Sequence, residues 1–123
     1  MPEEMTLYEM FAAIKTQQLA RGIDHSALTA EQSKAYANAC ALALHVEVSE
    51  LASSWAFAPW KTTDTDVENI KREIVDCLFF LANIAESFGI TTQDLEDMFL
   101  WVLDNNYKRM QNGHHKEVIG SSL

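Results

Sequence analysis

Hydrophobic and polar positions along the chain follow the three- and four-residue spacing of α-helices. Ile70, Ile74, Cys77, Leu78 and Leu81 recur at these steps, which predicts one apolar face on an amphipathic helix. No segment of the sequence shows the sustained two-residue alternation that indicates a β-strand. The pattern therefore predicts an all-α protein with a four-helix bundle core, its helices covering roughly residues 6–21, 29–57, 66–88 and 92–112.

The predicted helix ends carry recognisable capping residues. Three pairs have the spacing of a capping box, namely Thr6 with Glu9, Thr29 with Gln32 and Thr65 with Glu68. Thr91 or Thr92 precedes the fourth helix, where acidic Asp94 favours a helix start. Three glycines follow helix-patterned stretches, at Gly22, Gly89 and Gly113, where a left-handed C-terminal cap is expected.

The predicted second helix has little polar surface. Its apolar residues are Ala35, Ala39, Cys40, Ala41, Leu42, Ala43, Leu44, Val46, Val48, Leu51 and Ala52. A helix that is apolar on several sides must be covered on several sides. We therefore expect a homo-oligomer, either a homodimer or a homotetramer, assembled through this helix.

Length and charge narrow the class of protein. A chain of 123 residues has room for one domain, so 1–123 is predicted to be a single unit with a loosely ordered tail over 113–123. The formal net charge is -9, which is the wrong sign for binding a nucleic acid polymer. An acidic protein can still bind a small phosphorylated molecule when a divalent cation lies between its carboxylates and the phosphates.

The cellular setting is predicted from apolar runs and cysteines. The longest uninterrupted apolar run, Ala39–Leu44, is far shorter than the roughly 18 residues of a membrane-spanning helix. Cys40 and Cys77 lie in apolar stretches without CxxC spacing, which favours buried free thiols in a reducing compartment. A cytoplasmic protein that does not enter a membrane is the expectation.

Four acidic residues are the candidate chemistry of the chain. Glu47 and Glu50 lie three positions apart on the second predicted helix, and Glu73 and Asp76 have the same spacing on the third. Each pair projects from neighbouring positions on one helix face, and both pairs interrupt apolar residues. If the two helices pack antiparallel, the four carboxylates converge. Such a cluster of oxygen donors favours Mg²⁺, or Mn²⁺, over zinc.

Two other interpretations of the acids have to be compared with this one. They could be ordinary solvated helix positions paired with Lys71, Arg72 or other bases. A di-iron carboxylate site needs a Glu-x-x-His motif, and no histidine of the sequence lies three residues after a glutamate. Iron is therefore disfavoured.

The acidic motifs resemble those of a known superfamily. Glu47-Val48-Ser49-Glu50 and Glu73-Ile74-Val75-Asp76 are similar to the ExxE and ExxD motifs of the all-α nucleoside triphosphate pyrophosphatases, which include MazG and the dimeric dUTPases. Further segments resemble the dUTPase-like branch: Asn69-Ile70-Lys71, Trp60-Lys61, and Asn106-Tyr107-Lys108-Arg109 with Asn112-Gly113. The whole resemblance covers about residues 45–113.

The resemblance implies Mg²⁺-dependent hydrolysis of a nucleoside triphosphate to the monophosphate and pyrophosphate, with a deoxypyrimidine triphosphate such as dUTP or dCTP as substrate. The four acids would then hold the metal and carry the catalysis, with Glu47 or Glu50 as the alternative general base. The expected substrate-binding residues are Trp60, Lys61, Asn106, Lys108 and Arg109. Gln17 or Gln18 resembles the base-reading glutamine of dimeric dUTPases only loosely.

Two positions depart from the family pattern. Val46 stands where many relatives have a further glutamate, and Phe79 stands where dimeric dUTPases often have histidine. Two alternative functions follow. One is a MazG-like housekeeping pyrophosphatase with broad or different base preference, and the other is a non-catalytic helical module that oligomerises or binds a partner.

Overall fold

The computed structural model describes residues 4–55, 60 and 64–113. Its α-helices are α1 (Leu7–Ala20), α2 (Ala30–Ala52), α3 (Val67–Ser87) and α4 (Thr92–Gln111), with a short 3₁₀ helix, η1 (His25–Ala27), between α1 and α2. The described residues include no β-strand. The predicted all-α class and its four helices are therefore confirmed.

The helix boundaries agree with the predicted caps at three of four starts. Thr6, Thr29 and Thr91 each close a complete capping box. The prediction for Thr65 is wrong, because α3 is capped by Asp66, whose carboxylate accepts a hydrogen bond from the Asn69 backbone N–H at 3.0 Å. Aspartate at this position satisfies a free N–H and also carries the charge that a helix N-terminus favours.

The second helix is shorter than expected. It ends at Ala52, with a turn at residues 53 and 54, although the apolar pattern predicted a helix to residue 57. Residues 56 and 57 lie outside the described part of the chain. Gly22 and Gly89 have φ angles of 86° and 67° and follow α1 and α3, so both act as the expected left-handed caps.

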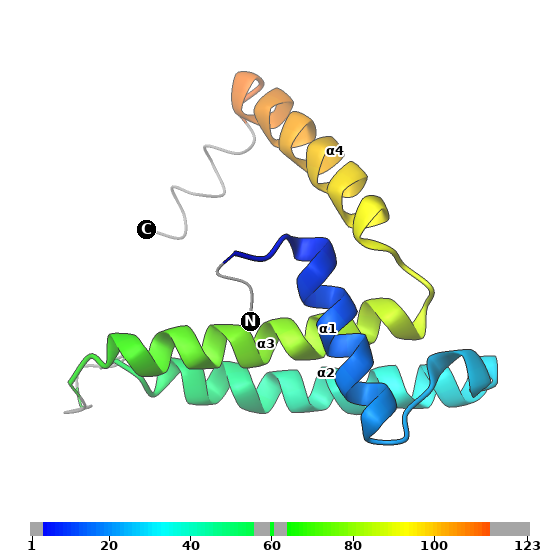
Figure 1. Ribbon diagram of the computed structural model, residues 1–123. Helices are drawn as coiled ribbons and strands as arrows, with labels where there is room; N and C mark the ends of the chain where they lie inside the picture. The colour runs from blue at the N-terminus through cyan, green and yellow to red at the C-terminus, as the bar shows by residue number, and fades with distance from the viewer. Residues whose placement is uncertain (1–3, 56–59, 61–63, 114–123) are drawn as a thin grey trace. The chain divides into compact units, whose positions relative to one another are not determined.

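Helices α2 and α3 run antiparallel, side by side along their length (Figure 1). A hydrogen-bonded clamp, consisting of Ser54, Asp66 and Asn69, joins the end of α2 to the start of α3. Asn69 Nδ2 donates to the hydroxyl of buried Ser54 at 2.7 Å, and the Asp66 backbone N–H donates to the Ser54 carbonyl at 2.8 Å. These bonds fix which turn of α2 faces which turn of α3.

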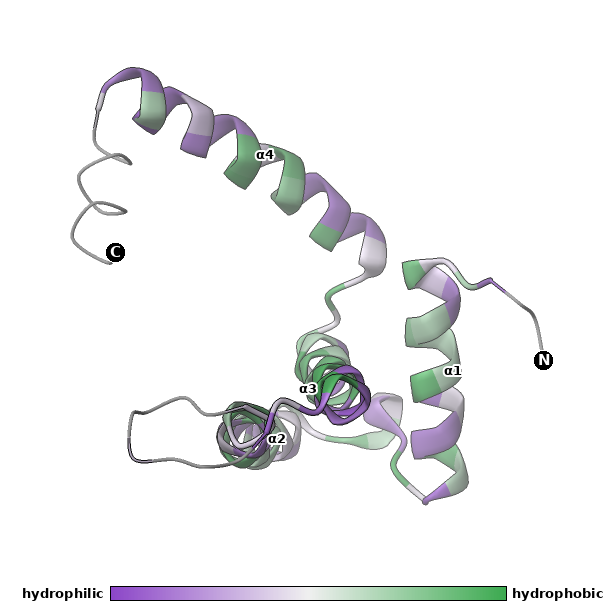
Figure 2. Ribbon diagram, turned by 90° about the vertical axis from the view of Figure 1, so that its left-hand side faces the viewer, coloured by the Kyte–Doolittle hydropathy of each residue, from purple (hydrophilic) through white to green (hydrophobic). Residues whose placement is uncertain are grey.

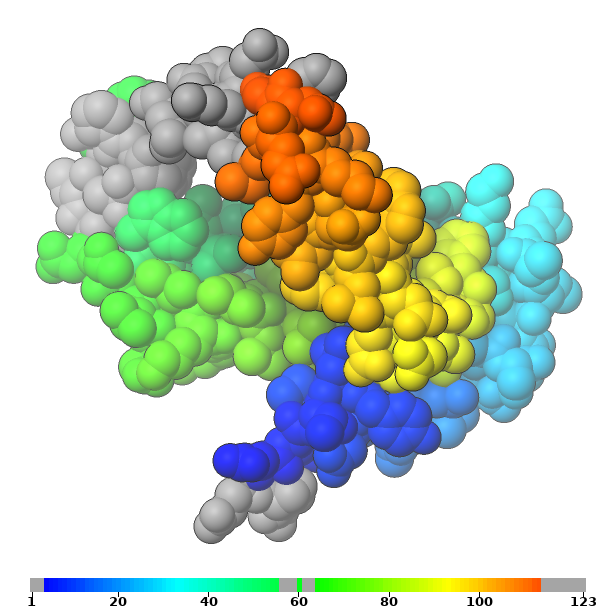
Figure 3. Space-filling model, turned by 90° about the horizontal axis from the view of Figure 1, so that it is seen from above, coloured from blue at the N-terminus to red at the C-terminus, as the bar shows by residue number. Residues whose placement is uncertain are grey.

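Helix α1 packs across α3 (Figures 1 and 3). Its two buried residues, Ile14 and Gln18, lie one turn apart on the same face. Lys15 forms an ion pair with Glu86 of α3 at 3.0 Å. Gln18 is a buried polar side chain next to buried Ile14 on this helix.

Side chains on α2 divide into a buried and an exposed set. Ala37 and Cys40 are buried, whereas Leu42 is 69% exposed and Val46 is 57% exposed. Cys40 and Cys77 are both free thiols, with Cys77 only half-buried. Leu42 and Val46 lie one turn apart and form an apolar stripe on this helix.

Helix α4 belongs to a second compact unit, residues 91–123, separate from the unit formed by residues 1–90. Hydrophobic residues gather along one side of this helix (Figure 2). Lys108 in its last turn pairs with Asp104 at 2.9 Å. Among the described residues, no single helix is long and apolar enough to cross a membrane, although α3 and α4 taken together as a broken pair reach that length and composition.

Candidate active site

Three of the four predicted acids meet between α2 and α3. One carboxylate oxygen each from Glu47, Glu73 and Asp76 lies within 4.8 Å of the other two. We call these three residues the acid cluster. The antiparallel packing predicted to bring the two helices' acids together is confirmed, and the clamp at Ser54 and Asn69 sets the register that aligns them.

The carboxylates of the acid cluster are short of partners. Glu47 Oε2 and Glu73 Oε2 are shielded from solvent and have no hydrogen-bond partner among the described residues. The pKa of Glu47 is raised to about 7, first by its contact with the Glu73 carboxyl group and then by burial and by the charges of Glu50, Glu73 and Asp76. Like charges held this close disfavour full ionisation.

The nearby basic residues on α3 are engaged elsewhere. Lys71 pairs with Glu68 at 2.8 Å, and Arg72 donates to Asn69 Oδ1 at 3.3 Å. In the described contacts, neither Lys71 nor Arg72 pairs with the acid cluster. A buried carboxylate without a base requires a proton or a cation.

A divalent cation fits the donor set. The acid cluster offers only oxygen ligands, the type that Mg²⁺ and Mn²⁺ prefer. Opposite ligands of Mg²⁺ are about 4.2 Å apart, since each metal–oxygen bond is about 2.1 Å. Among three octahedral ligands at most one pair lies opposite, and adjacent ligands are about 3.0 Å apart. Separations of up to 4.8 Å would therefore have to shorten by at most about 2 Å.

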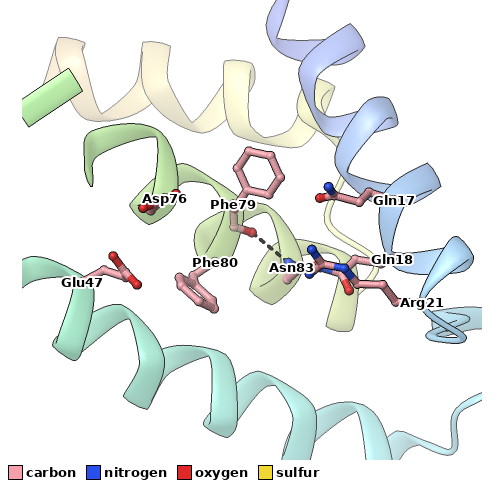
Figure 4. A pocket seen from close by; sticks show the side chains of 8 residues that line it. All are labelled: Gln17, Gln18, Arg21, Glu47, Asp76, Phe79, Phe80 and Asn83. Atoms are coloured by element: carbon pink, nitrogen blue, oxygen red, sulfur yellow. Dashed lines mark hydrogen bonds between the residues drawn. The ribbon is translucent and has the colours of Figure 1, made fainter. Parts of the chain in front are cut away.

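A cavity of about 400 Å³ opens beside the acid cluster. Glu47 and Asp76 lie at one end, and Gln17, Gln18, Arg21 and Asn83 lie at the other (Figure 4). Phe79 and Phe80 of α3 lie between the two ends. The volume is within the usual range for a small-molecule site, and its two ends differ in charge.

Three residues of the cavity lining, Arg21, Phe80 and Asn83, were not singled out from the sequence. Gln17 and Gln18, which resembled a base-reading glutamine only loosely, both line the cavity. Asn83 could have been found because it lies seven residues, or two turns, after Asp76 on the same face of α3. Arg21 follows the last residue of α1, and nothing in its sequence context indicated a site.

The remaining predicted residues are not gathered in this cavity. Glu50 is exposed and lies outside the acid cluster, and Trp60 is 77% exposed. Lys61 falls outside the described residues. Asn106, Lys108 and Arg109 all lie on α4, where Asn106 is half-buried and the two basic residues are exposed.

A family model described as dUTPase matches residues 7–112, which includes all four helices. Neither a curated protein nor a solved structure matches the chain.

Proposed function

The chain belongs to the dUTPase family, and from that premise we propose that it is a Mg²⁺-dependent nucleoside triphosphate pyrophosphohydrolase. Its proposed substrate is a deoxypyrimidine triphosphate such as dUTP, converted in the cytoplasm to the monophosphate and pyrophosphate. The observation that carries the proposal is the acid cluster, with two unpartnered carboxylate oxygens beside a cavity of nucleotide size.

In this proposal the acid cluster holds the cation through Glu47, Glu73 and Asp76. Bound there, Mg²⁺ would neutralise phosphate oxygens and lower the pKa of an attacking water molecule. Glu47 or Glu50 is the alternative general base, which would accept a proton from the attacking water. Glu50 contributes negative charge at the edge of the cluster.

The opposite end of the cavity would receive the nucleoside. Phe79 and Phe80 offer aromatic faces between the acids and the amides, and aromatic faces favour stacking with a base. Trp60, Lys61, Asn106, Lys108 and Arg109 remain proposed substrate contacts.

We also propose a homo-oligomer, dimer or tetramer. The exposed stripe of Leu42 and Val46 on α2 supports it, because an apolar helix face in water favours association. Light scattering at micromolar concentration tests it directly. A monomer there would contradict it.

The function is tested by incubating the protein and Mg²⁺ with each common ribonucleoside and deoxynucleoside triphosphate. The products are separated by ion-exchange chromatography. We expect deoxynucleoside monophosphate and pyrophosphate, with no diphosphate, and turnover concentrated on dUTP. Similar turnover of many bases would favour the MazG-like alternative. No turnover with Mg²⁺ or Mn²⁺ would favour the non-catalytic module.

A further inference from the structure

Asn83 has an amide whose orientation is fixed by the protein. Its Nδ2 donates a hydrogen bond to the carbonyl oxygen of Phe79, one turn earlier on α3, at 2.9 Å (Figure 4). A carbonyl oxygen only accepts hydrogen bonds, so the nitrogen and not the oxygen must face it. Asn83 is also only 3% exposed, and a buried amide is costly to leave unpaired.

This fixed orientation determines what Asn83 can offer to a ligand. An unrestrained amide can rotate by 180° and present either a donor or an acceptor to the same point. Rotation of Asn83 would break its bond to Phe79 and set two oxygens against each other. Because Nδ2 is committed to that bond, Oδ1 is the acceptor that the residue presents to the cavity it lines.

The groups across the cavity complement this acceptor. Arg21 lines the same end, and its guanidinium is exclusively a donor. Gln18 is buried there as well, and its amide carries two N–H donors and an oxygen acceptor. The nucleoside end of the cavity therefore combines one fixed acceptor with donors from α1.

We propose that Asn83 is a specificity-determining residue that selects a 2,4-dioxopyrimidine over a 4-aminopyrimidine. A dioxopyrimidine presents its N3–H between two carbonyl oxygens, which matches an acceptor flanked by donors. A 4-aminopyrimidine in the same place turns the lone pair of N3 toward Oδ1. Asn83 cannot relieve that repulsion without losing its bond to Phe79. The inference rests on the proposed function for its substrate class, and it adds the residue that discriminates between bases.

The first test compares kcat/KM for dUTP and dCTP in the full chain. Asn83→Leu has nearly the same size and removes the acceptor. We expect the dUTP:dCTP ratio to fall by about tenfold or more, because a polar site loses its discrimination when its partner group is removed. Ser87→Ala is the matched control, since Ser87 is a buried polar residue one turn later that bonds only to the Asn83 backbone carbonyl among the contacts described. Its ratio should stay within about twofold.

The second test leaves the protein unchanged. Binding of 2′-deoxyuridine and of 3-methyl-2′-deoxyuridine to the wild-type chain is followed by NMR through the Asn83 side-chain amide. The methylated nucleoside keeps both carbonyls and lacks the N3–H, so we expect it to bind at least about tenfold more weakly. This measurement needs neither phosphate nor turnover.

The two tests separate the inference from the proposed function. The wild-type chain could hydrolyse no nucleotide and still bind deoxyuridine more tightly than its methylated form. That result would contradict the proposed enzymatic function and support the base-selecting role of Asn83. A working enzyme whose folded Asn83→Leu variant retains its base preference would overturn the role of Asn83. Equal binding of the two nucleosides would overturn it as well, even if the Asn83→Leu variant failed to fold.

Discussion

Two polar clusters lie where α2 and α3 meet, and they differ in whether their polar atoms have hydrogen-bond partners. At the clamp, Asn69 Nδ2 donates to the Ser54 hydroxyl at 2.7 Å, and the Asp66 backbone N–H donates to the Ser54 carbonyl at 2.8 Å. At the acid cluster, Glu47 Oε2 and Glu73 Oε2 are shielded from solvent without a partner among the described residues. Both clusters join the same two helices.

This difference in hydrogen bonding indicates that the clamp serves stability and the acid cluster serves function. Satisfied polar groups between two helices add to stability and specify their register. Unsatisfied like charges reduce stability and persist where a ligand supplies the missing partner. We infer that the clamp holds the helices in place so that the acid cluster can remain unpaired until a cation arrives. Variants at the two clusters should therefore change activity and stability in different proportions.

The largest expected effect is loss of turnover at the acid cluster. Asp76→Asn or Glu73→Gln should reduce kcat/KM by about a thousandfold, corresponding to roughly 4 kcal/mol of lost transition-state stabilisation. The metal-free variants should unfold at the same or higher temperature than the wild type, because a repulsive charge is removed. Steady-state kinetics and thermal unfolding followed by circular dichroism measure both effects.

Glu68→Gln is the matched control for this experiment. Glu68 is an acidic residue on α3 that is exposed and paired with Lys71. Its substitution should leave turnover within about twofold, because a surface ion pair contributes little. Wild-type activity in either Asp76→Asn or Glu73→Gln would contradict the assignment of the site.

Variants at the clamp should lose more stability than activity. Asn69→Ala leaves the buried Ser54 hydroxyl without its donor, which should lower the free energy of unfolding by about 1–3 kcal/mol. Turnover should fall far less than in Asp76→Asn. Urea unfolding measures the change. Ser53→Ala is the control, because the exposed Ser53 hydroxyl bonds only a carbonyl of its own helix in the described contacts. Equal stability of Asn69→Ala and Ser53→Ala would show that the clamp does not hold the helices.

The fold could be predicted from local signals. Capping boxes at Thr6, Thr29 and Thr91 and the apolar spacing along α3 depend only on residues three or four positions apart. The end of α2 was predicted too late, because apolar residues continue past Ala52 after the helix itself has ended. Asp66 caps α3, although Thr65 was predicted to do so. The capping-box spacing takes no account of the negative charge of aspartate, which a helix N-terminus favours.

The site could be predicted only in part. Glu47, Glu73 and Asp76 were found because carboxylates inside apolar faces are unusual. Glu50 was expected beside them, but its position at the next turn leaves it exposed and outside the cluster. Asn83 was missed although it lies two turns after Asp76 on α3. Arg21 could not be assigned, since its place in the cavity depends on the packing of α1 across α3, which no residue spacing in α1 encodes.

A pH dependence should distinguish the acid cluster from the capping acids. The pKa of Glu47 is raised from 4.5 to about 7, so the folded state binds more protons than the unfolded state between these values. Stability of the metal-free protein should therefore be greatest near pH 5 and fall as the pH rises through about 7. Added Mg²⁺ should restore stability most strongly at pH 8, where the cluster is ionised.

Thermal unfolding from pH 5 to 8, with and without Mg²⁺, measures this dependence. The capping acids Asp24 and Asp94 have pKa values lowered below 3.8 by hydrogen bonds to Ser26 and Thr91. Their contributions to stability are lost only at lower pH, outside this range. A metal-free stability that rises between pH 5 and 8 would contradict the repulsive acid cluster.

The smallest expected effect tests Glu50, which lies outside the acid cluster but helps to raise the pKa of Glu47. Glu50→Gln should shift the loss of metal-free stability to lower pH, because one repulsive charge is removed while the Glu47–Glu73 contact remains. Glu31→Gln, at the far end of the same helix, removes an equal charge and should leave that midpoint unchanged. Turnover of Glu50→Gln should fall by less than about tenfold, which is about 1.4 kcal/mol. A loss as large as that of Asp76→Asn would instead make Glu50 a fourth metal ligand, and the cluster would then have to close around the ion when it binds.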